Sequence, residues 1–497
     1  MSERLSPLDA SFLYLEEPET AMHVGSVMIF QERPGGLDFD HLVRHVAARI
    51  AFVPRYRQRV RPVPGRLANP VWVDDEHFDI HYHVRRSALP QPGTDAELAE
   101  LVARLQARAL DRRRPLWEMT VVEGLQSERF AVVTKVHQAM VDGVQAVDLG
   151  QVILDESPRV PEPPADTWHP TPEPSQVELL AGAVVESVRR PGQVLEVLRT
   201  GVSDMRTTVS RTADALGGLA LAARTATNPP PASPLNRAIS EHRRYAMIAT
   251  DLEDYRRIRN QHLARPGRRR TSRTRPAAGA VPAGAGFGGN GQAPTMTIND
   301  VVLATLAGGL RAWLLARGQP VPAGSTVRAL VPMSVRVEDP REAGAVGGRV
   351  ASLLVDLPTG EPSPQMRLYQ VAFQTKAHRD TGQAVDAPAI AGIAGFAPPT
   401  LHSLGARVAS GLSRRLFNVV ITNVPGPQQP LYLDSARMLA SYPVIPLARG
   451  QALSIGLTSY DGGVFYGLNA DRDAMSDLDV LVQCILDSLT ELVEASQ

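Results

Sequence analysis

The residues most able to do chemistry lie in one short segment, Lys135-Val-His137-Gln138-Ala-Met-Val-Asp142-Gly143. Residues 130–136 alternate as a half-buried strand does, so polar side chains would be delivered to the strand end. Gly143 favours a turn after Asp142, and a helix is expected to follow. A histidine held by a carboxylate can activate an alcohol, because the imidazole accepts the proton while the carboxylate fixes the tautomer of the ring. The segment therefore indicates general-base chemistry on a hydroxyl group.

The composition excludes several other kinds of site. The chain has 497 residues, with 52 basic and 52 acidic side chains, so its zero net charge gives no electrostatic footprint for nucleic acid. Its one cysteine, Cys484, excludes an intramolecular disulfide, a cysteine zinc cluster and an iron–sulfur site. The sequence contains no GxGxxG, P-loop or HExxH pattern, so nucleotide-binding and zinc-protease functions lack support. We therefore expect no metal, no prosthetic group and no nucleic-acid partner.

The sequence does not predict secretion or membrane insertion. Residues 1–20 carry acidic side chains where a signal peptide needs an apolar core. The apolar run 301–310 ends at Arg311, which makes it too short to span a bilayer. We therefore expect a cytoplasmic protein.

Periodicity predicts the elements that must position the motif. Strands are predicted over 24–30 and 130–136, and helices over 95–109, 177–224 and 297–318, where Thr297 or Asn299 would cap the helix. Further strands are predicted at VRALVPMSV, VASLLVDL, FNVVITNV, ALSIGLTSY and VFYGLNA, the last two joined by an Asp461-Gly462 hairpin turn. The predicted fold class is therefore mixed α/β.

Two segments are predicted to lie outside the packed core. Residues 158–176 are rich in proline and acidic side chains, which is typical of a linker or a surface crossover. Residues 266–293 pass from arginine-rich to Gly/Ala-rich sequence, which cannot bury a core, so a disordered insertion is predicted there. The insertion is expected to be solvated, and an electrostatic tether to anionic lipid or RNA is the alternative.

The chain resembles the bacterial wax ester synthases/diacylglycerol acyltransferases, a family of the coenzyme A-dependent acyltransferase superfamily. The superfamily motif HHxxxDG is present here as His137-Gln138-x-x-x-Asp142-Gly143. The resemblance covers nearly the whole chain and rests on these further blocks, which follow in order: Leu5-Ser-Pro-Leu-Asp-Ala-Ser-Phe12, Met22-His-Val-Gly25, Arg114-Pro-Leu-Trp-Glu118, Thr297-Ile-Asn-Asp-Val301, Leu330-Val-Pro-Met-Ser334, Thr422-Asn-Val-Pro-Gly-Pro427, Tyr442-Pro-Val444 and Ser459-Tyr-Asp-Gly462.

This resemblance implies a fold and a reaction. The implied fold is two chloramphenicol-acetyltransferase-like mixed-sheet domains with a tunnel between them: residues 1–157 with the motif, a crossover over 158–235, and residues 236–497. The implied reaction transfers a long-chain acyl group from acyl-CoA, a substrate and not a cofactor, to diacylglycerol or a fatty alcohol. Acyl-CoA and the alcohol would enter the tunnel from opposite sides and meet at the motif. The implied location is the inner face of the membrane or a lipid-droplet surface, with peripheral attachment.

The chain departs from the family motif at Gln138, which stands where the second histidine, by resemblance the general base, is expected. Glutamine cannot accept a proton near pH 7, although it can hydrogen-bond a hydroxyl group. Neighbours on an extended strand point to opposite faces, so His137 is expected to face away from Gln138. If the enzyme is active, the resemblance implies that His137, Asp142 and the amide of Gln138 share the catalytic work. Otherwise His137 is a core histidine behind the site, and Asp142 has a structural role such as pairing an arginine. A catalytically weak or silent lipid-binding member is the alternative function, and an acceptor that ionises without a base is a third.

Other family blocks supply candidates for the substrate tunnel. Asn299 and Asp300 either cap a helix or help to form the tunnel. Asn423, Pro425 and Gly426 form a tight turn at the end of a buried strand, where the backbone either lines the coenzyme channel or has a purely structural role.

Overall fold

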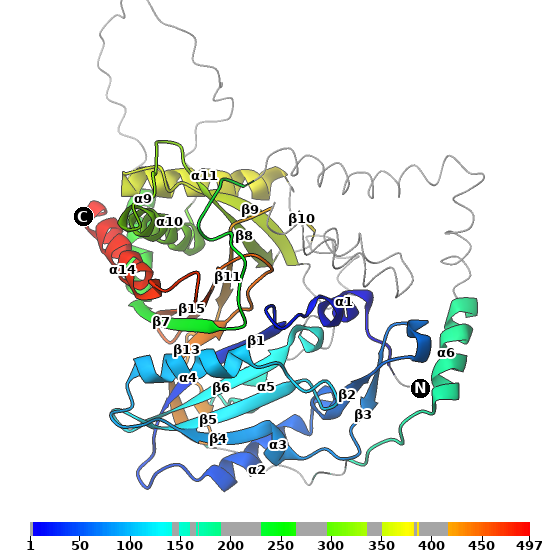
Figure 1. Cartoon of the computed structure of the whole chain (residues 1–497). Helices are drawn as coiled ribbons and strands as arrows, with labels where there is room; N and C mark the ends of the chain where they lie inside the picture. Colours follow the sequence, from blue (N-terminus) through cyan, green and yellow to red (C-terminus); the bar gives the residue numbers. More distant parts are fainter. Residues whose placement is uncertain are drawn as a thin grey trace, which may run out of the picture. The chain divides into compact units, whose positions relative to one another are not determined.

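The computed structural model describes residues 3–141, 149–159, 166, 168–189, 230–264, 296–334, 350–381, 385–386 and 416–497. These residues form strands and helices in the predicted mixed α/β class, with two large sheets (Figure 1). The chain divides into two compact units. We call them the sheet unit (Met1–Asp251, Val327–Leu354 and Ala384–Asp479) and the helical unit (Leu252–Thr326, Val355–Gln383 and Val480–Gln497).

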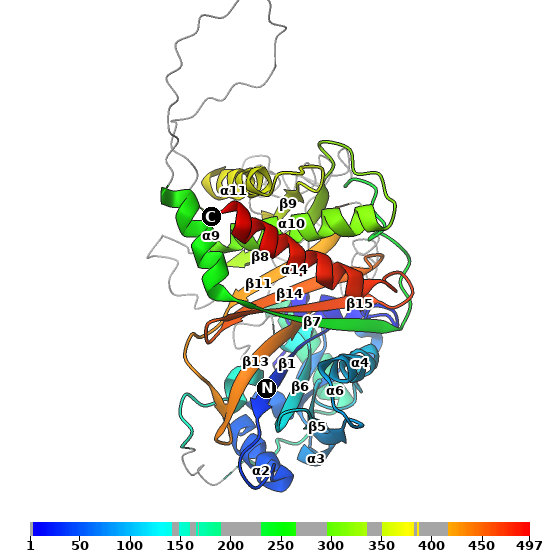
Figure 2. The same ribbon diagram turned by 90° about the vertical axis from the view of Figure 1, so that its left-hand side faces the viewer.

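The first sheet has six strands in the order β12-β13-β1-β6-β5-β4. Its strands are β1 (His23–Gln31), β4 (Val84–Ala88), β5 (Trp117–Leu125), β6 (Arg129–His137), β12 (Tyr432–Leu433) and β13 (Ala436–Val444). β1 pairs antiparallel with β6 on one side and with β13 on the other (Figure 2), so this sheet contains strands from both ends of the sequence. The strands predicted over 24–30 and 130–136 are confirmed as β1 and β6.

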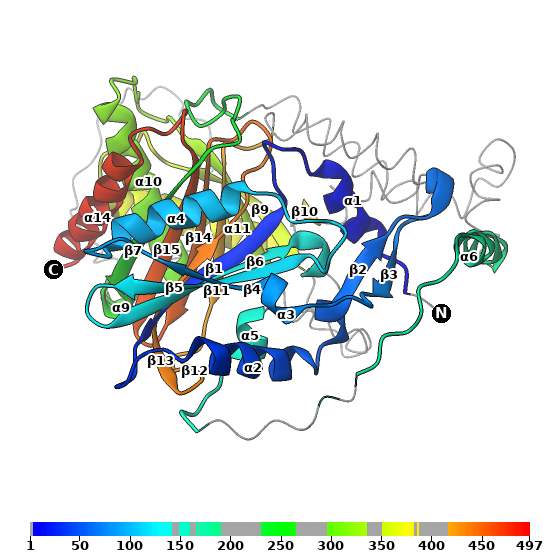
Figure 3. The ribbon, with the colours of Figure 1, turned by 60° about the horizontal axis from the view of Figure 1, so that its bottom comes forward.

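Helices cover both faces of the six-stranded sheet. Figure 3 shows α2 (Phe39–Ile50) on one side of the sheet and α4 (Asp95–Ala107) on the other. Because both faces are covered, β6 is buried along almost its whole length instead of alternating with solvent. α4 confirms the helix predicted over 95–109 and begins with a capping box in which Thr94 and Glu97 satisfy each other's backbone N–H groups.

Shorter elements complete this part of the sheet unit. They are α1 (Pro7–Leu15), β2 (Gln58–Arg61), β3 (Val71–Asp74), α3 (Ile80–His83), α5 (Leu149–Ile153), α6 (Gln176–Arg189) and the 3-10 turns η1 (Pro54–Arg57), η2 (Pro64–Arg66) and η3 (Gln138–Met140). The helix predicted over 177–224 is described only as α6. The rest of that segment and the predicted insertion 266–293 lie outside the described residues, and the predicted domain boundaries stay predictions.

The second sheet has seven strands in the order β10-β9-β8-β11-β14-β15-β7. They are β7 (Arg243–Asp251), β8 (Val327–Ser334), β9 (Val350–Leu357), β10 (Val385–Asp386), β11 (Val419–Pro425), β14 (Leu453–Tyr460) and β15 (Gly463–Asp471). β11 runs parallel to β8 and β14, whereas β15 is antiparallel to β14 and β7. The predicted hairpin is confirmed: Asp461 and Gly462 have φ of 43° and 83°, as a type I′ turn requires.

Strand β13 joins the two sheets within the sheet unit. It is hydrogen-bonded to β1 of the first sheet and also packs against β14 and β15 of the second. The Tyr245 hydroxyl of β7 donates to the Pro443 carbonyl of β13 at 2.9 Å. Gly467 of β15 lies so close that a Cβ atom there would be 1.9 Å from the same carbonyl oxygen. Only glycine therefore fits at this crossing of the strands.

The helical unit contains α9 (Leu252–Ala264), α10 (Ile298–Ala316), α11 (Pro364–Thr381) and most of α14 (Leu478–Ala495). Thr297, not Asn299, caps α10, in a reciprocal capping box with Asp300. Gly308 and Gly309 admit α14, since a Cβ atom on Gly309 would lie 2.7 Å from the Ile485 side chain. α10 is longer than the apolar run 301–310, and by length and composition alone it could cross a membrane, but 72% of its apolar window is buried, as in a core helix.

The close approach at Gly467 predicts that adding a single methyl group there lowers the stability of the fold. Gly467→Ala should lower the free energy of unfolding by about 1–3 kcal/mol or more, because the new Cβ meets a backbone oxygen that cannot rotate away. The matched control is Gly182→Ala inside α6, where a Cβ meets nothing within 4 Å. That substitution should stabilise by about 0.5–1 kcal/mol. Denaturant unfolding of the two variants beside the parent measures both, and equal midpoints would contradict the close approach.

Candidate active site

The motif lies where three strands of the six-stranded sheet begin or end. β6 ends at His137, which pairs with His23 at the start of β1, and Val136 pairs with Trp117 at the start of β5. The His137 N–H donates to the Leu116 carbonyl at 2.9 Å, and the Gln138 N–H donates to the Met22 carbonyl at 2.9 Å. The chain then turns into η3, with His137 as its N-cap. These backbone bonds fix the position of the motif.

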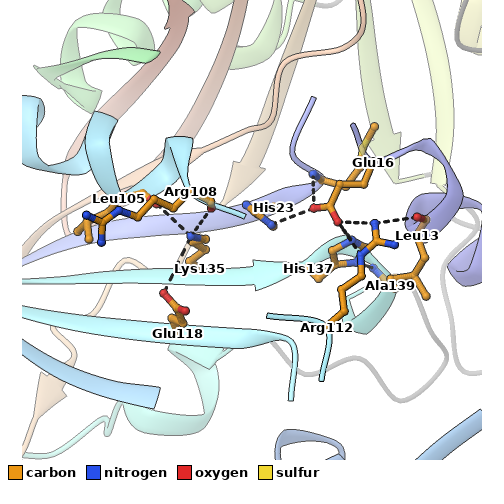
Figure 4. Close-up of polar contacts among 11 residues, drawn as sticks. Leu13, Glu16, His23, Leu105, Arg108, Arg112, Glu118, Lys135, His137 and Ala139 are labelled. Carbon is orange, nitrogen blue, oxygen red and sulfur yellow. Dashed lines mark hydrogen bonds and ion pairs between the residues drawn. The ribbon is translucent and has the colours of Figure 1, made fainter. Parts of the chain in front are cut away.

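His137 is fully buried, with one ring nitrogen hydrogen-bonded and the other facing Glu16 (Figure 4). Its Nδ1 accepts the Ala139 N–H at 3.0 Å, and its Nε2 lies 3.7 Å from Oε2 of Glu16. A neutral imidazole has one lone pair, so this arrangement places the proton on Nε2. His137 can then accept a proton from a substrate only by giving up the bond to Ala139, and the geometry favours the core histidine over the catalytic one.

Gln138 has a different environment from its neighbour. Its side chain is half-buried, whereas His137 is completely excluded from solvent. The strand ends at His137 and Gln138 already belongs to η3, so strand alternation does not decide where residue 138 points. Asp142 and Gly143 lie outside the described residues, and their predicted roles stay predictions.

Glu16, at the C-terminal end of α1, is the centre of a polar cluster that the motif alone does not reveal. Its Oε1 lies 3.1 Å from Nε2 of His23 and accepts the Met22 N–H at 3.3 Å. Its Oε2 accepts from Nε and Nη2 of Arg112 at 3.0 and 2.5 Å. Burial acts to raise the pKa of Glu16, but the interactions with His137 and His23 outweigh it and hold this pKa well below its usual range. The carboxylate is therefore ionised at neutral pH.

Lys135 anchors a helix and does not face the motif. Its ammonium group donates to the carbonyls of Leu105 and Arg108, at 3.0 and 2.6 Å, at the C-terminal end of α4. Glu118 lies 4.0 Å away, below Lys135 in Figure 4. Burial lowers the pKa of Lys135 to about 8. A cation bound to the last carbonyls of a helix complements the helix dipole, so this lysine has a structural role.

The other predicted site residues lie at the start of α10 and at the end of β11, and the tunnel roles predicted for them stay predictions. Asp300 is fully buried and accepts from the Thr297 N–H at 2.8 Å and from the Thr375 hydroxyl at 2.6 Å, so it is the partner of Thr297 in the capping box of α10. Asn423 and Pro425 lie at the end of β11, and the following Gly426 N–H donates to the Ser459 carbonyl at 3.0 Å. Asn299 and Asp300 belong to the helical unit, whereas residues 423–426 belong to the sheet unit with the motif.

Sequence reasoning missed Glu16, His23 and Arg112 as members of one cluster. Two family blocks, 5–12 and 22–25, surround Glu16 on either side, and this was the available signal. Among the described residues, no group of three or more His, Cys, Asp or Glu could hold a metal ion.

Similarity to known proteins covers almost the whole chain. The profile of the wax ester synthase/diacylglycerol acyltransferase catalytic domain matches residues 5–263, and the profile of the WS/DGAT C-terminal domain matches residues 346–493. A Mycobacterium tuberculosis protein named probable diacylglycerol O-acyltransferase tgs3 is 44% identical over 263 residues, which are 53% of this chain and 97% of the relative. Another, named tgs2, is 32% identical over 99% of both chains. The solved wax ester synthase/diacylglycerol acyltransferase from Marinobacter aquaeolei VT8 superposes with a TM-score of 0.66 at 26% identity, over 99% of both chains.

The buried histidines predict a loss of stability in mild acid. Burial lowers the pKa of His23, which faces Glu16, Lys135 and His137, to about 4. Burial also lowers the pKa of His83, whose Nδ1 lies 2.7 Å from the Trp117 carbonyl, to about 4. Between about pH 6.5 and 4 the unfolded chain binds protons that the folded chain excludes. The free energy of unfolding therefore decreases as the pH is lowered through this range, by up to about 1.4 kcal/mol per pH unit for each histidine.

Urea unfolding at a series of pH values from 7 to 4.5 measures this slope. His23→Gln should make the slope shallower, and His81→Gln, at an exposed position, should leave it unchanged. A slope that His23→Gln does not alter would contradict the assignment of neutral His23.

Proposed function

The chain belongs to the wax ester synthase/diacylglycerol acyltransferase family, and we propose that it transfers a long-chain acyl group from acyl-CoA to diacylglycerol or a fatty alcohol. The observation that carries this proposal is the motif His137-Gln138, fixed at the joined ends of β1, β5 and β6 inside the region that matches the catalytic domain. In the transfer, the acceptor oxygen forms the new ester bond and the carbon–sulfur bond of the thioester breaks. The hydroxyl proton ends on the sulfur of coenzyme A.

The fate of that proton depends on Gln138, since the amide cannot take it. The amide oxygen of Gln138 can still accept a hydrogen bond from the attacking hydroxyl and orient it. His137 is a poor substitute, because its lone pair is occupied by the Ala139 N–H. We infer a transfer without a side-chain base, in which the thiolate leaving group takes the proton. Such a reaction should be slower by about 10²–10⁴ than one with a general base.

A silent lipid-binding protein is the second candidate function, and the same two residues favour it. It would bind acyl-CoA or neutral lipid without turnover. Incubating the chain with labelled long-chain acyl-CoA and either diacylglycerol or a fatty alcohol decides between the two. Labelled triacylglycerol or wax ester above the no-enzyme rate supports the transferase. Binding of acyl-CoA with no product from either acceptor supports the silent protein.

Restoring the histidine predicts a gain in rate. Gln138→His should raise turnover by about 10²–10⁴, the usual contribution of a general base. Acyl-CoA binding should barely change, because one side chain of similar size is exchanged. Steady-state kinetics with both acceptors measure the two effects separately. A parent enzyme that turns over acyl-CoA at a rate which Gln138→His does not raise would show that the missing base is wrongly assigned.

We also propose peripheral attachment to the inner face of the membrane or to lipid droplets, with the protein otherwise in the cytoplasm. The proposed products are insoluble in water, so an enzyme that releases them benefits from a lipid surface. The start of the 177–224 segment is exposed: Val177 of α6 is 74% accessible to solvent. The arginines of that segment could meet anionic headgroups.

This attachment predicts salt-sensitive flotation. The chain should float with vesicles that contain anionic lipid at low salt, and largely remain in the bottom fraction at high salt, because counter-ions screen the arginine–headgroup attraction. Vesicles of neutral lipid are the control and should bind little at either salt concentration. Equal binding at both salt concentrations, or none at either, would contradict the electrostatic attachment.

A further inference from the structure

We infer that Glu16 is a positioning residue for the reaction, a role that rests on the proposed acyl transfer. Glu16 would not touch the substrate. It would hold residue 138, the position of the family's base, through two independent connections. The inference depends on what surrounds the carboxylate and on where those neighbours lead.

The Glu16 carboxylate accepts hydrogen bonds from the Met22 N–H and from Arg112, and Nε2 of both His23 and His137 lies within 4 Å of it. The Met22 N–H and Nε2 of His23 face Oε1, and the Arg112 guanidinium and Nε2 of His137 face Oε2. Nε2 of His137 must carry its hydrogen, because Nδ1 accepts from Ala139. An ionised carboxylate is the side chain that accepts on both oxygens and donates on neither. The side chain of Glu16 is only 7% exposed, so water cannot readily replace a lost partner.

Two of these neighbours lead directly to residue 138. Met22 gives its N–H to Glu16 and accepts the Gln138 N–H on its own carbonyl at 2.9 Å. His137 precedes Gln138 in the chain, and its ring spans from Glu16 to the Ala139 N–H on the other side of Gln138. The contacts of Met22 and His137 therefore connect the backbone on both sides of residue 138 to the Glu16 carboxylate.

Arg112 completes the cluster and brings in a fourth segment. It donates to both Glu16 and the Leu13 carbonyl of α1, the latter at 2.8 Å, and it precedes the strand β5 that pairs with β6. The end of α1, the start of β1, the approach to β5 and the end of β6 thus meet at Glu16. A small displacement at the carboxylate is transmitted to residue 138, and displacements of about 1 Å can cost 10²-fold in rate.

The decisive comparison is Glu16→Gln against Glu16→Asp, each in the parent and in the Gln138→His background. Glutamine keeps the size of Glu16 but has one acceptor oxygen and an NH₂ group that must face donors on one side. Aspartate is shorter but accepts on both oxygens. We expect Glu16→Gln to lower kcat by about 10- to 100-fold with KM for acyl-CoA changed less than about twofold. Glu16→Asp should retain more activity than Glu16→Gln.

The neighbouring residue supplies a matched control. Glu17 makes its ion pair at the surface, with Arg449 at 3.3 Å, so Glu17→Gln should leave kcat unchanged. Hydrogen–deuterium exchange gives a readout that needs no turnover. Peptides covering residues 22–24 and 137–141 should exchange faster in Glu16→Gln than in the parent, and not in Glu17→Gln.

The outcomes separate this inference from the proposed function. If the parent and Gln138→His both lack transferase activity, the proposed function fails, and the exchange experiment alone judges Glu16. If Glu16→Gln matches or exceeds Glu16→Asp in kcat, or leaves exchange at 22–24 and 137–141 unchanged, the positioning role is wrong. If Glu16→Gln does not fold, Glu16→Asp still tests it: a rise in KM equal to the fall in kcat would contradict a role in positioning.

Discussion

The pairing of β1 on both of its edges is the constraint on which the rest of the sheet unit depends. β1 bonds to β6, which carries the motif, and to β13, which comes from the last quarter of the sequence. Because β13 also packs on β14 and β15, it links the second sheet to the first, and α4 adds a second link by packing against β7. Gly467 lies so close to Pro443 that no side chain larger than that of glycine fits between these strands. Residue 137 is therefore positioned, through β1, by a strand about 300 residues later in the chain, as well as by its own strand.

Local signals were sufficient to predict most of the elements. The strand predicted over 130–136, the helix over 95–109 and the Asp461-Gly462 turn each correspond to an observed element, although β6 is buried almost throughout and is not half-buried as its alternation predicted. The insertion of β12 and β13 beside β1 has no such signal. Strand pairing between residues 23–31 and 436–444 depends on the fold as a whole, and a single sequence records no trace of it.

Part of the site could likewise be predicted from the sequence, and part could not. The motif could be found from residue types and spacing, and the departure at Gln138 was visible at once. The cluster around Glu16 could not be found so directly, because its members come from four segments that meet only in the folded chain. The structure also separates neighbours that looked alike in sequence. Lys135 donates to carbonyl groups at the end of α4, and His137 accepts a hydrogen bond within the turn that follows β6. Of the three residues, only Gln138 is half-exposed.

The place of β13 in the sequence has a consequence during synthesis. A ribosome completes β1 at residue 31 and reaches β13 about 400 residues later, which at about 5–20 residues per second takes roughly 20–80 s. Throughout that interval one edge of β1 lacks its native partner, and open strand edges recruit other strands. The nascent N-terminal half is therefore a natural client for holding chaperones. Slow codons placed between β6 and β13 would lengthen its exposure and lower the soluble yield.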